Sequence, residues 1–203
     1  NILYMGMDRL ENKTIGLLGG TFDPIHIGHL IIAEKVREEF NLEKVIFIPA
    51  GIPPHKKSAF TSSFHRYNMV KIAVSDNSFF DVSDIEIKKK SPSYTYITVK
   101  KMKKMYNNYN IFFIIGQDSL LDLPNWYNAN KLIKEVDFIV AKRTIDFKYE
   151  KNENFPVNFK LSNSPIIGIS SSYIRTCIKE RKSIKYLLPE KVRMYIKKEN
   201  IYG

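Results

Sequence analysis

The chain has 203 residues, of which 44% are hydrophobic, and its formal net charge is +11 at pH 7. This length and hydrophobic content suffice for one domain with a substantial core. The single cysteine, Cys177, excludes an internal disulfide bond and fits a reducing compartment, so we expect a cytoplasmic protein. No apolar run is long enough to span a membrane, which excludes an integral membrane protein and predicts a soluble one.

The positive charge favours anionic partners: nucleic acid, an anionic membrane surface or phosphorylated small molecules. Many of the lysines stand in short runs, such as residues 88–90 and 100–104. Runs of this kind are typical of solvated faces, so the charge alone does not select among these partners.

Residues 1–13 lack the basic start and apolar stretch of a signal peptide. We expect them to form a leader outside the fold. Two origins stay open for it: a remnant of cloning, with Met5 or Met7 as the native start, or a disordered native segment.

From Ile15 onward, short apolar strand patterns alternate with amphipathic helix patterns. In chain order we expect strand 15–18, helix 30–40, strand 45–48, helix 64–74, strand 80–83, helix 95–106, strand 111–115, helix 126–134 and strand 138–141. From Ser170 to a helix ending near Glu199 the tail reads as purely helical. The alternation predicts an α/β fold, a doubly wound parallel sheet covered on both faces, with a helical C-terminal segment. We expect residues 14–203 to form a single domain.

In sheets of this kind, ligands bind beyond the carboxyl ends of the strands, where the strand order reverses. Three unusual segments directly follow a strand: residues 19–29, 49–57 and 116–126. We therefore expect these segments to converge on one cleft.

Residues 19–29 read GGTFDPIHIGH. Gly19 and Gly20 have no Cβ atoms, so the backbone can turn sharply after the strand. A phosphate could then approach the amides of Gly20, Thr21 and Phe22 within hydrogen-bonding distance. The paired glycines thus predict a phosphate cradle, although a GG pair after a strand also forms ordinary turns.

The helix that follows is expected to begin near Gly28, with unpaired N–H groups and a partial positive charge at its start. His26 and His29, three residues apart, share a face there and can both reach one phosphate chain. Other interpretations stay open, because a histidine pair could bind a metal and His29 is in phase with the apolar helix residues, as a core histidine would be. The complete strand-to-helix string favours phosphate.

The second segment, IPAGIPPHKK at residues 48–57, contains paired prolines that stiffen a loop carrying His55, Lys56 and Lys57. A rigid basic loop opposite a phosphate cradle indicates a second anion, with an ordinary surface loop as the alternative. In the third segment, SPSYTY, Ser93 or a neighbour is expected to cap a helix whose first turn presents the amide of Thr95.

The fourth segment is GQDSLLDLPNW, residues 116–126. Asp118 directly after a strand suits ribose hydroxyls, and Trp126 offers a flat face for a heteroaromatic ring or a side chain for the core. In the fifth segment, GISSSYIR, serines stand at a helix start, where they cap or bind phosphate. Arg175, one turn later, can neutralise charge on a leaving phosphate.

The order and spacing of GGTFDPIHIGH, IPPHK, PSYTY, IIGQD to LPNW and ISSSYIR resemble those of the bacterial nicotinate mononucleotide adenylyltransferases. The resemblance runs from about Ile15 to Tyr202, and YLLPEKVRMYI is similar to that family's closing segment. The first motif specifies only the nucleotidyltransferase superfamily, whereas the later ones specify the branch. Gln117 and Ser91 stand where that family commonly has alanine and glycine, so contact details near these turns are less secure.

The resemblance implies a Rossmann-like fold and an enzyme of NAD biosynthesis that converts ATP and nicotinate mononucleotide to deamido-NAD and pyrophosphate, with Mg²⁺. It implies no nucleic-acid or membrane partner, and a homo-oligomer stays open. The implied ATP site comprises Gly19, Gly20, Thr21, Phe22, His26, His29, Ile169, Ser170, Ser171 and Arg175, of which His26, His29 and Arg175 are catalytic. The implied mononucleotide site comprises Lys56 at the phosphate, Asp118 at ribose, and Thr95 and Trp126 at nicotinate. No protein-held metal site is expected, and Arg143 is a weaker candidate for the cleft wall.

Three alternatives stay open. The first is a sister transferase, such as a pantetheine-phosphate adenylyltransferase or a cytidylyltransferase, although these lack the combined later motifs. The second is a class I aminoacyl-tRNA synthetase fragment, because residues 26–29 read HIGH, but no KMSKS-like loop follows. The third is a basic, non-catalytic RNA-binding module, which saturable ATP binding without nucleic acid would exclude.

Overall fold

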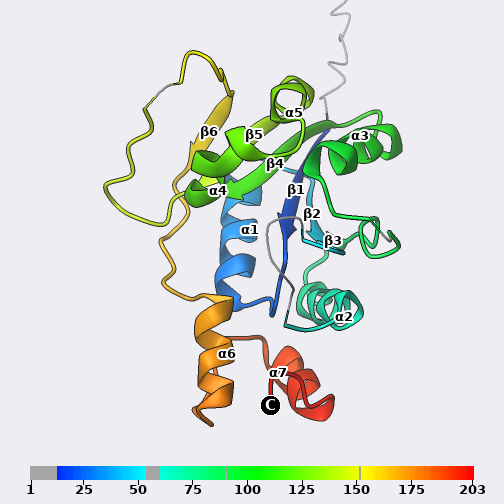
Figure 1. Cartoon of the computed structure of the whole chain (residues 1–203), viewed down its shortest axis with the longest axis vertical. Coiled ribbons are helices and arrows are strands. Elements are labelled where there is room, and N and C mark those ends of the chain that lie inside the picture. The colour runs from blue at the N-terminus through cyan, green and yellow to red at the C-terminus, as the bar shows by residue number, and fades with distance from the viewer. Residues whose placement is uncertain (1–12, 54–59, 90, 151) are drawn as a thin grey trace, which may run out of the picture.

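A computed structural model describes residues 13–53, 60–89, 91–150 and 152–203. Its centre is a six-stranded sheet with the strand order β3-β2-β1-β4-β5-β6 (Figure 1). The strands are β1 (Thr14–Gly20), β2 (Lys44–Pro49), β3 (Phe80–Val82), β4 (Asn110–Gly116), β5 (Asp137–Ala141) and β6 (Phe159–Ser162). Every neighbouring pair is parallel. This is a doubly wound order, and the predicted α/β class is confirmed.

The helices connect and cover the strands. They are α1 (Ile27–Glu39), α2 (Ser63–Val74), α3 (Thr95–Met105), α4 (Gln117–Asp122), the 3-10 turn η1 (Leu123–Asn125), α5 (Ala129–Glu135), α6 (Ser171–Lys179) and α7 (Glu190–Lys198). The tail, which was expected to be purely helical, contains two helices separated by the non-helical residues 180–189, and α7 packs beside α2 (Figure 1). No helix in the described ranges combines the length and apolarity needed to cross a membrane.

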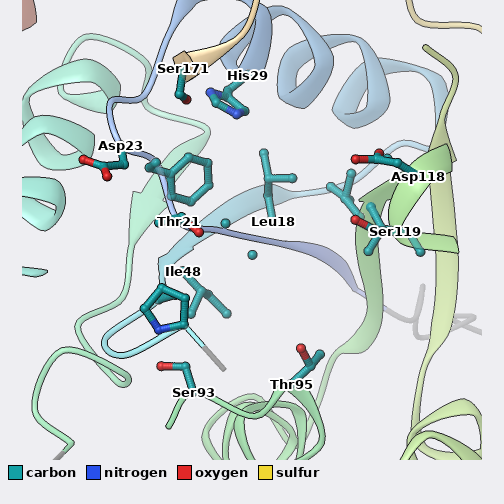
Figure 2. A pocket seen from close by; sticks show the side chains of 18 of the residues that line it. Leu18, Thr21, Asp23, His29, Ile48, Ser93, Thr95, Asp118, Ser119 and Ser171 are labelled. Atoms are coloured by element: carbon teal, nitrogen blue, oxygen red, sulfur yellow. The ribbon is translucent and has the colours of Figure 1, made fainter. Parts of the chain in front are cut away.

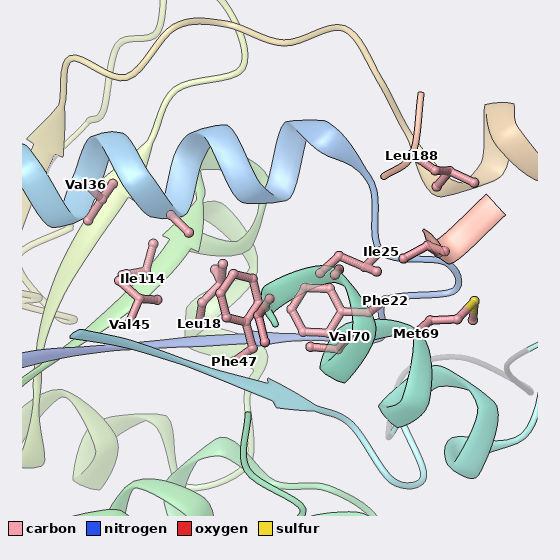
Figure 3. Packing of buried hydrophobic residues seen from close by; sticks show 14 of the residues in the cluster. Leu18, Phe22, Ile25, Val36, Val45, Phe47, Met69, Val70, Ile114 and Leu188 are labelled. Carbon is pink, nitrogen blue, oxygen red and sulfur yellow. The ribbon is translucent and has the colours of Figure 1, made fainter. Parts of the chain in front are cut away.

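Alternating side chains of the central strands supply a hydrophobic core on each face of the sheet. On the face covered by α1, α2, α6 and α7 the buried strand residues include Leu18, Val45, Phe47 and Ile114 (Figure 3). On the face covered by α3, α4 and α5 they include Leu17, Ile46, Ile48 and Phe113. Because both faces are buried, each of the central strands β1, β2, β4 and β5 reads as a continuous apolar run, and this is why the sequence revealed them.

Three elements lie outside the predicted set: β6, α4 and the 3-10 turn η1. The edge strand β6 was not expected, since Lys160 and Leu161 are exposed and the strand has no apolar run. No helix was predicted at residues 117–122, which form the short helix α4. Helix α5 begins later than the predicted residue 126, after Asn128 in a left-handed conformation with φ of 54°.

Candidate active site

A pocket of about 690 Å³ opens beyond the carboxyl ends of β1 and β4, where the strand order reverses. All three post-strand segments contribute to its lining, through residues such as Thr21, Ala50 and Asp118, so their predicted convergence is confirmed. His29 and Ser171 lie on one side of the pocket, and Ser93 and Thr95 lie on the opposite side (Figure 2). The pocket volume is in the range typical of ligand sites.

The turn after β1 forms for a different reason from the predicted one. Gly19 and Gly20 belong to the strand, and no described glycine has a positive φ. Their missing Cβ atoms leave room for aromatic rings, because a Cβ at Gly19 would lie 2.9 Å from Phe113 Cζ and one at Gly20 would lie 2.8 Å from Phe22 Cζ. The left-handed residue of the turn is Phe22 itself, with φ of 49°.

The two histidines form a stacked pair at the start of α1. His26 is the N-cap residue, and its ring centroid lies 3.7 Å from that of His29. The His26 backbone N–H donates to His29 Nδ1 at 3.2 Å. Because Nδ1 accepts this bond, a neutral His29 carries its proton on Nε2. The expectation that both rings reach one point is met, with His29 in the pocket wall (Figure 2).

Both imidazoles are neutral in this environment. Burial, and then the positive charge of Arg143, lower the pKa of His26 from 6.5 to about 4. Burial lowers the pKa of His29 as well, followed by the charges of His26 and Arg143. Nδ1 of His26 is buried without a hydrogen-bond partner among the described residues. A buried polar atom without a partner is costly, and a ligand could supply the missing partner.

The start of α1 is less open than expected. The N–H of Ile27 donates to the carbonyl of Leu187 in the C-terminal tail at 3.0 Å, and the N–H of His29 donates to His26 O at 3.0 Å. These two N–H groups are therefore not free for a phosphate, which corrects the prediction of an unpaired first turn. The tail thereby fixes the position of the histidine pair.

Helix α6 brings its polar residues to the same side. Ser170 caps the helix by accepting from the N–H of Tyr173, and Ser171 Oγ donates to Pro24 O at 2.8 Å. Arg175 donates to Asp23 O at 2.6 Å, and its guanidinium lies 4.2 Å from the ring centroid of Phe60. These contacts fix a permanent positive charge in the pocket wall.

On the opposite side, the first turn of α3 lines the pocket through Thr95 and Thr98. The N-cap residue is Tyr94, not Ser93. Ser93 Oγ instead accepts from the N–H of Gly51 at 2.9 Å and so connects this segment to the loop after β2. The N-cap residue is therefore a neighbour of Ser93, as the prediction allowed, although its side chain makes no capping hydrogen bond, and Thr95 in the first turn is confirmed.

Asp118 lies at the pocket wall, where one carboxylate oxygen pairs with Arg143 Nε at 3.1 Å. Arg143 also lines the pocket, as the weaker prediction had it. Gln117 fixes the backbone beside it: its Oε1 accepts from the N–H groups of Arg143 at 2.7 Å and Thr144 at 3.2 Å. Gln117, which stands where the resembled family commonly has alanine, thus holds the loop after β5.

Trp126 is half-buried in the pocket wall, and its indole N–H donates to Asp122 at 3.2 Å. The next residue, Tyr127, stacks on Tyr94 with ring centroids 4.3 Å apart, and both line the pocket. Sequence reasoning missed this tyrosine pair, although both residues adjoin predicted site residues.

Two predicted residues are not placed in the pocket wall. Ile169 packs against the core beside α1 and does not belong to the described lining, which begins at Ser170 on this segment. Lys56 lies outside the described residues.

Sequence reasoning also missed Glu86, a buried carboxylate in the lining that accepts from Thr98 Oγ1 at 2.6 Å.

The donor set does not match a protein-held metal centre. The described residues contain no group of three histidine, cysteine or carboxylate side chains that could hold a metal ion. Asp23, within the histidine motif, uses its carboxylate to accept from the Phe60 N–H at 2.7 Å and from the Tyr202 hydroxyl at 2.6 Å. These residues fit a cation that arrives on a nucleotide, since Mg²⁺ is commonly held by substrate phosphates with few protein ligands.

Comparisons with known proteins agree with this geometry. A model of the cytidylyltransferase-like family matches residues 17–177. A probable nicotinate-nucleotide adenylyltransferase of Desulfitobacterium hafniense is 46% identical over 198 residues, with 94% of this chain and 96% of that protein covered. One of Exiguobacterium sibiricum is 43% identical, with 93% and 98% covered.

Among solved structures, the chain is similar to Plasmodium falciparum nicotinic acid mononucleotide adenylyltransferase complexed with NaAD. The TM-score is 0.76 at 27% identity, with 94% of this chain and 97% of that chain covered. Because the sequence matches extend over nearly the full length of both partners, the chain belongs to the nicotinate-nucleotide adenylyltransferases, within the cytidylyltransferase-like family.

Proposed function

We propose that the protein transfers the AMP part of ATP to nicotinate mononucleotide, which gives deamido-NAD and pyrophosphate in NAD biosynthesis. The names of its relatives support this assignment. The observation that carries it is the two-sided pocket: His29 and Ser171 lie opposite the start of α3 at Thr95 (Figure 2), and His26, Arg175 and Trp126 line the same cavity.

The first side suits the ATP phosphates. His29 offers the Nε2 proton, and Arg175 supplies a charge that does not depend on pH near neutrality. The phosphate of a mononucleotide is largely dianionic at neutral pH, so it can attack the α-phosphorus without a general base. Catalysis then consists of in-line alignment, while His26, His29 and Arg175 stabilise the charge of the departing pyrophosphate.

The second side suits the mononucleotide. Trp126 presents a partly exposed ring for stacking on pyridine, and Asp118 presents carboxylate oxygens toward a ribose. Lys56 completes the proposal as the contact to the mononucleotide phosphate, on the strength of the motif alone. The amides of Gly20, Thr21 and Phe22 belong to the ATP half of the same proposal.

The start of α3 favours an acid over an amide at the pyridine ring. The carbonyl of its N-cap residue, Tyr94, accepts from Ile97 and Thr98, so the N–H groups of Thr95 and Tyr96 precede the first helical bonds. The positive end of the helix dipole therefore faces the pocket without an acidic residue in the first turn. A carboxylate needs only donors, whereas an amide also needs an acceptor.

Mg²⁺ enters this proposal as part of the nucleotide substrate. Bound to the phosphates, it supplies charge neutralisation for the leaving pyrophosphate. The histidine pair and Arg175, which line the pocket, would bind the phosphates that carry the ion.

Pyrophosphate release with ATP and either nicotinate or nicotinamide mononucleotide tests the proposal. We expect the acid to be used with the higher kcat/KM. The amide is the informative competitor, because Glu86, a buried carboxylate of the same half, could accept from its nitrogen. Preference for the amide would overturn the assignment of the start of α3 as a carboxylate site, and no release with either would overturn the reaction.

A further inference from the structure

The most deeply buried charge in the described part of the chain belongs to a residue that the reaction above does not use. Arg66, on the first turn of α2, is only 1% exposed. No ion pair within the described residues includes Arg66, and the carboxylates of Asp23 and Glu86 act on it only through longer-range attraction. Burial lowers the pKa of Arg66, yet a guanidinium stays protonated in proteins. Burying a charge without an ion-pair partner costs free energy, which the hydrogen bonds of the charged group must offset.

Its hydrogen bonds show where that charge acts. Nη1 donates to Thr21 O at 2.7 Å, Nη2 donates to Gly51 O at 2.8 Å, and Nε donates to Thr61 O at 3.3 Å. Thr21 belongs to the loop after β1, and Gly51 to the loop after β2. One planar group therefore spans the two loops that approach the two halves of the pocket, and charge-assisted bonds of this kind are among the stronger ones.

The connection continues to the far side of the pocket. Gly51, whose carbonyl accepts from Arg66, donates its own N–H to Ser93 Oγ at 2.9 Å. Ser93 lies two residues before α3, and Figure 2 shows it opposite His29. A continuous series of hydrogen bonds thus runs from the loop beside the histidines, through Arg66 and Gly51, to the segment that begins α3.

We propose that Arg66 is a positioning residue, which fixes the distance between the loop after β1 and the loop after β2 and so aligns the α-phosphorus of ATP with the phosphate of the mononucleotide. The proposal rests on the function proposed above. Arg66 touches neither substrate in this arrangement, and it acts only through the backbone carbonyls that it holds.

A residue that spans both loops affects both substrates, which distinguishes it from a residue on one side of the pocket. In Arg66→Lys the charge remains, but one ammonium cannot reach all three carbonyls. We expect KM to rise for both ATP and the mononucleotide, and kcat/KM to fall by on the order of 100-fold if the loops separate by about 1 Å. Arg66→Met removes every donor and is expected to show the larger loss, so the lysine variant lies between it and the wild type.

A matched control separates positioning from stability. Asn68, on the same helix, donates to the Tyr195 hydroxyl at 3.2 Å and makes no hydrogen bond to the described residues of either loop. Asn68→Ala should lower Tm without changing either KM, because loss of folded protein lowers only the active concentration. If Arg66→Lys behaves in the same way, with both KM values unchanged in folded protein, the proposal is wrong.

Two further measurements keep the test independent of variant folding and of the reaction itself. Calorimetric titration of ATP alone into wild type and Arg66→Lys should show weaker binding to the variant, even if the wild type releases no pyrophosphate with these substrates. In the unaltered protein, the ¹⁵N NMR signal of the Arg66 Nε–H should shift on addition of ATP alone and of mononucleotide alone. A signal that responds to neither would overturn the proposal.

Discussion

The lowered pKa of His26 predicts how much the free energy of unfolding decreases in mild acid. In the folded protein His26 has a pKa of about 4, whereas the ordinary value is 6.5. Between these pH values the unfolded chain binds a proton that the folded protein excludes. The free energy of unfolding must therefore decrease as pH falls from 6.5 towards 4.

The magnitude follows from the two pKa values. His26 alone should cost about 2 kcal/mol of stability between pH 7 and pH 5, and about 3 kcal/mol by pH 4. His29 adds a loss of the same sign, since its pKa is also lowered by burial. Because His26 is only 6% exposed, solvent screening reduces its contribution little.

Urea unfolding of wild type and His26→Asn at pH 7 and pH 5 measures the effect. Asparagine does not titrate and is a favourable N-cap residue, so α1 should keep its start. We expect the variant to lose about 2 kcal/mol less than the wild type between the two pH values. Ser171→Ala, a non-titrating change in the same pocket, should keep the wild-type difference. Equal pH dependence in wild type and His26→Asn would refute the burial argument.

Three other changes have expected outcomes. His29→Ala should lower turnover by on the order of 100-fold in a folded protein, as loss of a strong transition-state donor does, and near-normal turnover in the pyrophosphate assay would contradict that role. Tyr202→Phe removes a donor from the buried carboxylate of Asp23 and should cost about 1–3 kcal/mol in urea unfolding; an unchanged midpoint would show that the bond contributes nothing. Gly19→Ala should cost about 1–3 kcal/mol, because its methyl group meets a phenyl ring, whereas Gly168→Ala, with no atom within 4 Å of the new Cβ, serves as the control that should stay stable.

The sequence predicted those parts of the fold that local burial determines. Strands covered on both faces read as uninterrupted apolar runs, so β1, β2, β4 and β5 were found with nearly correct bounds. Edge strand β6 has no such pattern, because only one of its four residues is buried. Its place in the sheet depends on β5 beside it, which no local pattern of residues 159–162 reveals.

In the candidate site, too, residues in local sequence patterns were predicted and contacts between distant segments were not. The histidine pair and Arg175 were predicted because their motifs are contiguous, whereas the hydrogen bond from the Gly51 N–H to Ser93 Oγ was not, because the two residues come from distant segments. Arg66 did leave a local signal that was overlooked. It stands three and four residues before the buried Met69 and Val70, on the buried face of α2, where an arginine needs buried acceptors.

The neutral histidines and the charged Arg175 in the pocket therefore have separate tasks in the proposed reaction. Stacked imidazoles 3.7 Å apart cannot readily both be charged, and their lowered pKa values keep them neutral. The charge that attracts a triphosphate then comes from Arg175, whose guanidinium is held by a backbone carbonyl. The imidazoles supply directional N–H donors instead. Because directional donors stabilise a developing charge only where they are already aimed, the contacts that fix the start of α1 matter as much to catalysis as the histidines themselves.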